Sequence, residues 1–104
     1  MSNKRDLFRA AMIDRDLAAT LAARMIERFV ARCAPGLLDA MRGADPHASL
    51  RSCAKGLRER EDRGDRAARE GDAADLDRLA EAVERHRLDW KAIDAKMQAR
   101  SGAN

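Results

Sequence analysis

The chain has 104 residues, of which 38% are charged, and its formal net charge is +3 at pH 7. This length predicts a single domain over residues 1–104, and the basic surplus is too small and too evenly spread to indicate a nucleic-acid surface. With two phenylalanines, one tryptophan and no tyrosine, the composition disfavours β-sheets and favours helices that each have one apolar face.

No segment has the features of a membrane span or a secretory signal. Every uncharged run is shorter than the ~20 residues that a membrane-spanning helix needs. Charged residues also occupy the start of the chain, where a signal peptide has its apolar core. We therefore expect a cytoplasmic protein in which the two cysteines, Cys33 and Cys53, are reduced and buried.

The first predicted helix covers residues 3–33 and ends before Pro35 and Gly36, which form a clear stop signal. Its apolar face is wider than a contact between two helices requires, so we expect other helices to pack on it from two sides. A short helical turn over residues 37–42 follows. Small residues near the centre of the first helix would let a neighbouring helix approach closely: Ala18, Ala19, Ala22 and Ala23.

The second predicted helix covers residues 46–70. Asp45 and Pro46 predict its start, because aspartate is a good cap residue and proline is tolerated at the first helical position. Its large apolar residues end at Leu57. The remainder, 58–70, mixes basic and acidic residues at helical spacing and is expected to form a solvated helical arm.

The third predicted helix covers residues 72–100, with Gly71 as the preceding turn and Asp72 as its cap. Residues at alternating spacings of three and four form one continuous, mostly apolar face on it. This face is the candidate partner-binding or dimer interface: Leu76, Leu79, Val83, His86, Trp90, Ile93 and Met97. Its histidine is expected to hydrogen-bond a neighbour or a backbone carbonyl and so fix the register of the helices.

An antiparallel hairpin of the second and third helices about Gly71 would cover only part of this face. In that register Ile93 lies opposite Leu50, but three residues have no large apolar side chain opposite them: Leu76, Leu79 and Val83. Leaving each of them in water would forfeit ~1.5–3 kcal/mol, so we expect a second chain to cover them. The predicted fold class is all-α: a three-helix bundle with a long antiparallel hairpin and coiled-coil-like packing, as a homodimer, with a self-contained monomer as the alternative.

No catalytic signature or cofactor-binding motif is present, and the acidic clusters are expected to be solvated helix surfaces. The spacing of the cysteines and histidines does not match the close ligand pairs of zinc sites. These residues are Cys33, His47, Cys53 and His86. We therefore expect no enzyme activity, no catalytic residue, no metal and no cofactor.

One segment is rich in arginine, and its side chains are the candidate phosphate contacts of an alternative function in DNA binding: Arg58, Arg60, Arg63, Arg66 and Arg69. Acidic residues are as frequent as arginines in this segment, and no aromatic residue is interleaved for base stacking. Nucleic acid is therefore a less favoured partner than protein.

The sequence favours a small, non-enzymatic helical module for protein–protein interaction, which would be an adaptor, chaperone or regulator acting through an apolar helix face. Its expected partners are a second copy of the chain, another protein, or both, and not a membrane. The alternatives are a dimeric helical DNA-binding regulator and a plain structural subunit.

Overall fold

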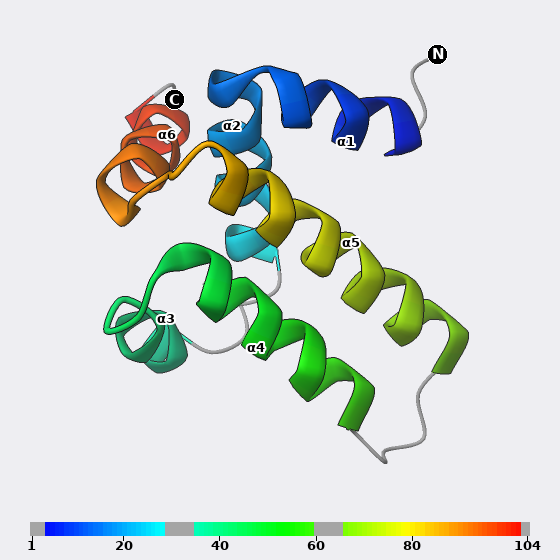
Figure 1. Ribbon diagram of the computed structural model, residues 1–104. Coiled ribbons are helices and arrows are strands. Elements are labelled where there is room, and N and C mark those ends of the chain that lie inside the picture. Colours follow the sequence, from blue (N-terminus) through cyan, green and yellow to red (C-terminus); the bar gives the residue numbers. More distant parts are fainter. Residues whose placement is uncertain (1–3, 29–34, 60–65, 103–104) are drawn as a thin grey trace.

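The computed structural model describes residues 4–28, 35–59 and 66–102. Every element within these ranges is a helix, and no strand occurs in them (Figure 1). The helices are α1 (Lys4–Ile13), α2 (Arg15–Ile26), α3 (Pro35–Met41), α4 (Pro46–Glu59), α5 (Arg66–Arg85) and α6 (Trp90–Gly102). The predicted all-α class is confirmed, and α3 lies where the short helical turn over residues 37–42 was predicted. The other five described helices stand in place of the three long ones that were predicted.

The prediction of one helix over residues 3–33 is wrong, because the helix is interrupted at Asp14, between α1 and α2. Asp14 has an extended backbone, with φ −103° and ψ 109°, and its side chain accepts a hydrogen bond from the N–H of Leu17 at 3.1 Å. Such a cap stabilises the first turn of a helix by typically ~1 kcal/mol. α1 and α2 therefore pack against each other at an angle (Figure 1). Residues 29–34, which belong to the same prediction, lie outside the described residues.

α4 and α5 run antiparallel and side by side, but the chain reverses earlier than predicted (Figure 1). α4 ends at Glu59 and α5 starts at Arg66, so the predicted boundary between helices 46–70 and 72–100 is wrong. Gly71 lies inside α5, where a glycine costs about 1 kcal/mol relative to alanine. Each large apolar side chain that this register buries gains ~1.5–3 kcal/mol, so burial outweighs the local preference for a turn at Gly71.

A second break divides the predicted helix 72–100 between α5 and α6. Arg87 has φ 52°, in the left-handed region, which costs a non-glycine residue about 1–2 kcal/mol. The N–H of Arg87 donates to the carbonyl of Glu84 at 3.1 Å, and the N–H of Leu88 donates to that of Val83 at 3.0 Å. These two bonds are those of a Schellman cap, which satisfies the last carbonyls of α5 although no glycine is present.

α6 starts with a cap of its own, because the Asp89 side chain accepts a hydrogen bond from the N–H of Ala92 at 2.9 Å. From there α6 packs mainly on α2, which also contacts α1 and α5. The alanines expected to permit close approach are all buried in α2: Ala18, Ala19, Ala22 and Ala23.

The core is formed mainly by side chains from α2, α4, α5 and α6, and Ala11 of α1 and Met41 of α3 are also buried in it. Its largest fully buried members are Ile26, Leu50, Leu76, Leu79, Val83 and Ile93. Three partly buried residues of α1 pack against this core from outside: Leu7, Phe8 and Met12. Among the described residues, no helix is both long and apolar enough to cross a membrane.

Candidate functional site

The first half of the predicted interface lies in the core. Leu76, Leu79 and Val83 are each at most 1% exposed. The expectation that they lack an apolar partner within the chain is wrong, because it depended on a hairpin that turned at Gly71. With the earlier reversal, α4, α1 and α2 all contact the helix that carries them.

Two ion pairs show the actual register of the hairpin. Arg58 Nη1 lies 2.6 Å from Asp77 Oδ2, and Arg51 Nη1 lies 2.6 Å from Glu84 Oε2. The α5 segment between Asp77 and Glu84 contains the buried Leu79 and Val83. The matching α4 segment, between the two arginines, contains the buried Ala54 and the partly buried Cys53 and Leu57. The apolar residues of the two helices therefore face each other between these ion pairs.

The second half of the predicted interface is only partly buried. Ile93 is fully buried, whereas His86, Trp90 and Met97 are half-buried. His86 Nε2 lies 2.7 Å from the carbonyl oxygen of Ala11, which matches the expected bond to a backbone carbonyl. This contact joins the end of α5 to the end of α1.

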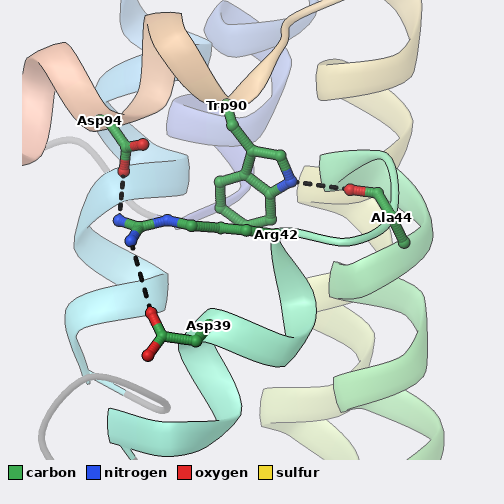
Figure 2. Close-up of polar contacts among 5 residues, drawn as sticks. All are labelled: Asp39, Arg42, Ala44, Trp90 and Asp94. Atoms are coloured by element: carbon green, nitrogen blue, oxygen red, sulfur yellow. Dashed lines mark hydrogen bonds and ion pairs between the residues drawn. The ribbon is translucent and has the colours of Figure 1, made fainter.

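Polar contacts fasten α6 to α3 and to the turn after it, and we call this group of five residues the α3–α6 clasp (Figure 2). Trp90 Nε1 donates a hydrogen bond to the carbonyl of Ala44 at 2.7 Å. Arg42 Nη2 lies 2.7 Å from Asp94 Oδ1, and its Nη1 lies 3.8 Å from Asp39 Oδ1. Trp90 is thus an anchor within the chain rather than a free aromatic surface.

The arginines proposed as phosphate contacts are only partly described. Arg58 donates to Glu70 at 2.9 Å and to Asp77 at 2.6 Å, and the hydrogen bond to Asp77, followed by that to Glu70, raises the pKa of Arg58. Arg69 is half-buried. The side chains of Arg60, Arg63 and Arg66 lie outside the described residues. Arg58 is therefore engaged by two carboxylates of α5 and does not face solvent as an unpaired cation.

Within the described ranges, no three His, Cys, Asp or Glu side chains are grouped so that they could hold a metal ion. Cys53 is half-buried, and its Sγ lies 3.8 Å from Sδ of Met41. Burial raises the pKa of the Cys53 thiol, so this side chain is a neutral, packed group at neutral pH. Cys33 lies outside the described residues.

A groove of about 350 Å³ lies between one face each of α1, α2 and α5, and we call it the α1–α2–α5 groove. Its apolar lining consists of Leu7, Phe8, Leu21 and Met25. Its charged lining consists of Lys4, Arg24, Arg28, Asp72 and Asp75. The sequence analysis did not identify this site. The apolar face of the first predicted helix, which is wider than one partner helix can cover, was an indication of it.

One ion pair closes the α1 side of the groove. Lys4 Nζ lies 3.0 Å from Oδ2 of Asp75, and Arg78 Nη1 lies 3.6 Å from the other carboxylate oxygen. Asp75 itself is 7% exposed. Two cations thus compensate a carboxylate that the fold removes from water, as a buried charge requires.

A second hollow, of about 400 Å³, has a different character. Its lining is almost entirely charged, with one apolar member: Met12, Arg51, Asp77, Glu81, Glu84 and Arg85. Several of these groups are already joined in the ion pairs between α4 and α5. The α1–α2–α5 groove is therefore the better candidate for binding an apolar surface.

Comparisons with protein-family models, with curated proteins and with solved structures found no match for this chain.

Proposed function

We propose that this protein is a small, non-enzymatic interaction module that binds an apolar helix of another protein in the α1–α2–α5 groove. The lining of this groove supports the proposal, because large apolar side chains from two helices meet there at the surface. Phe8 and Met25 are half-buried in it, whereas the residues of the predicted interface on α5 are in the core. The proposed binding surface is therefore the α1–α2–α5 groove and not the apolar face of α5 that was predicted from the sequence.

A helix suits this groove for energetic reasons. An amphipathic helix presents apolar side chains at spacings of three and four residues, and these can insert into a groove as anchors. Covering the exposed parts of Phe8 and Met25 would release water from apolar surface, which is the main favourable term in such contacts. A few anchors of this kind commonly carry most of the binding free energy.

The test compares two glutamate substitutions that differ in place but not in chemistry. Met25→Glu introduces a charge into the groove, whereas Ile13→Glu introduces one at an apolar residue that is 83% exposed and outside the groove. Binding of a fluorescent, leucine-rich amphipathic peptide is measured by anisotropy, and circular dichroism confirms that both variants are folded. We expect binding to be lost in Met25→Glu alone. Equal binding by both variants would refute the proposed site.

The homodimer and the coiled-coil-like packing inferred from the sequence remain predictions, as does the cytoplasmic location. Light scattering over a series of protein concentrations tests self-association. A dimer that dissociates in Met25→Glu would place the second copy in the same groove. DNA binding by a dimer also remains a prediction, and the engagement of Arg58 by two carboxylates makes it the weaker proposal.

A further inference from the structure

Most charged side chains that line the α1–α2–α5 groove already interact within the chain. Lys4 and Asp75 form an ion pair with each other. Arg28, which follows the end of α2, also has an interaction of its own. Within the described residues, two charged side chains of the lining form no ion pair or side-chain hydrogen bond: Arg24 and Asp72. These two are therefore available to a ligand.

Arg24 and Asp72 have opposite charges and come from different helices. Arg24 is exposed in the last turn of α2 and directly precedes Met25 of the apolar lining. Asp72 is half-buried on α5, one helical turn before Asp75. Since they line the same groove without pairing with each other, the groove presents a positive charge on its α2 side and a negative charge on its α5 side.

From this arrangement we infer that the partner is an amphipathic helix whose apolar stripe has acidic residues along one edge and basic residues along the other. Its acidic edge pairs with Arg24 and its basic edge pairs with Asp72. The inference rests on the proposed function and adds the charge pattern of the ligand. A helix with one sign of charge on both edges matches only one of the two residues and repels the other.

The two charges select the partner rather than supply the affinity. Burial of the apolar stripe is the larger, non-directional term. A helix that covers the groove also removes water from both charges, and a charge that loses water needs a partner of opposite sign. Asp72 is the more demanding of the two because it is already half-buried. Arg24 suits an acidic edge, because a guanidinium can form two parallel hydrogen bonds to one carboxylate.

The experiment uses four fluorescent peptides of roughly four helical turns, or about 15 residues, with the same leucine stripe. The edges are glutamate and lysine in the mixed peptide, glutamate only in the acidic one, lysine only in the basic one and glutamine only in the neutral one. In anisotropy titrations of the full chain, the mixed peptide should bind about threefold to tenfold more tightly than the neutral one. The acidic and basic peptides should bind no better than the neutral one. These preferences should shrink at high salt.

Reversing one charge of the groove should change which peptide binds best. Arg24→Glu leaves two acidic residues beside the apolar lining, so the basic peptide should bind best. Asp72→Lys leaves two basic residues, so the acidic peptide should bind best. The double variant Arg24→Glu/Asp72→Lys should again prefer the mixed peptide, which can reverse its direction along the groove. Since every protein meets the same four peptides, differences in peptide helicity do not produce these changes.

Matched controls make the same charge changes outside the groove. Arg15→Glu alters an exposed arginine of α2, and Glu81→Lys alters an exposed acidic residue of α5. Both should keep the order seen for the unmodified chain, and circular dichroism verifies folding. If Asp72→Lys does not fold, Asp72→Asn replaces it, and the acidic peptide should then bind as well as the mixed one.

The outcomes separate this inference from the proposed function. If the four peptides bind equally, or if the order is the same in the charge-reversal variants as in the unmodified chain, the charge pattern is refuted while the interaction module stands. If none of the four binds, the proposed function itself is refuted, and the charge pattern with it.

Discussion

The two helices that share the predicted interface, α5 and α6, are held in the molecule in different ways. On α5, Leu76, Leu79 and Val83 are fully buried, and three other helices contact α5. Of the predicted interface residues on α6, Ile93 is fully buried, whereas Trp90 and Met97 are half-buried. The position of α6 depends in addition on the polar contacts of the α3–α6 clasp, which join it to α3 and the following turn (Figure 2).

Apolar burial and polar contacts therefore have different roles in this fold: burial stabilises a helix, whereas polar contacts determine how the helix is oriented. Burial of a large apolar side chain contributes ~1.5–3 kcal/mol but does not define a direction. A hydrogen bond contributes a net ~0.5–1.5 kcal/mol and does define one. We therefore expect α5 to open only when the whole chain unfolds, and α6 to open locally at a lower free energy.

The largest expected effect comes from truncating the core of α5. Leu79 is fully buried, so Leu79→Ala should lower the free energy of unfolding by ~2–5 kcal/mol, through lost burial and the cavity left behind. Urea denaturation followed by circular dichroism measures this. Met97→Ala removes a half-buried side chain from α6 and should cost roughly half as much or less. Equal losses in the two variants would end the proposed contrast between the helices.

A smaller effect is expected in the clasp. Trp90→Phe removes the indole N–H that donates to the carbonyl of Ala44 at 2.7 Å. The loss should be ~0.5–1.5 kcal/mol, towards the lower end because Ala44 is exposed and water can replace the donor. Hydrogen exchange should become faster in α6 while α5 is unchanged. Faster exchange along both helices would show that they open together.

The turn between α5 and α6 should be improved by glycine. Arg87→Gly relieves a left-handed conformation that costs about 1–2 kcal/mol, but it also loosens the unfolded chain by roughly 0.5–1 kcal/mol. The net result should be a gain of up to about 1 kcal/mol in the free energy of unfolding. Arg85→Gly, at the end of α5, is the control and should destabilise the chain by about 1 kcal/mol. A loss in Arg87→Gly would mean that the arginine side chain itself stabilises the turn.

The same residues show which parts of the fold the sequence could predict. Apolar spacing predicted helices throughout, and Pro46 marked the start of α4. Gly71 misled the prediction, because a helix tolerates the ~1 kcal/mol that a glycine costs when several apolar residues are buried in return. Arg87 gave no signal, since left-handed caps are recognised by glycine or asparagine. Asp14 was a cap hidden within an apolar pattern that suggested continuity.

The candidate site was harder to predict than the helices for a geometric reason. Its apolar lining comes from α1 and α2, which were predicted as one continuous helix. Part of its charged lining comes from α5. A groove exists only because the helix break at Asp14 lets α1 turn so that it contacts both α2 and α5. The exposure of Phe8 and the burial of Leu79 both depend on this arrangement, and neither follows from the spacing of residues along one helix.

The smallest expected effect concerns a polar contact of α5, and it tests whether burial alone accounts for that helix. The hydrogen bond from Arg51, and then its charge, lower the pKa of Glu84. Because the folded pKa lies below that of an unfolded glutamate, about 4.3, the pair stabilises the fold above that pH. This contribution is lost as the pH falls through the folded pKa. Both side chains are largely exposed, so the effect should be the weakest of the four.

Urea denaturation of the unmodified chain and of Arg51→Gln, at pH 7 and at about pH 2, measures this contribution. A small difference in stability at pH 7 should disappear at the lower pH, where Glu84 is protonated. A difference that persists at low pH would mean that Arg51 acts through packing of its alkyl stem on the hairpin. A loss of stability in Arg51→Gln as large as that in Leu79→Ala would show that ion pairs contribute as much as burial to the stability of α5. The contrast between α5 and α6 would then be one of degree only.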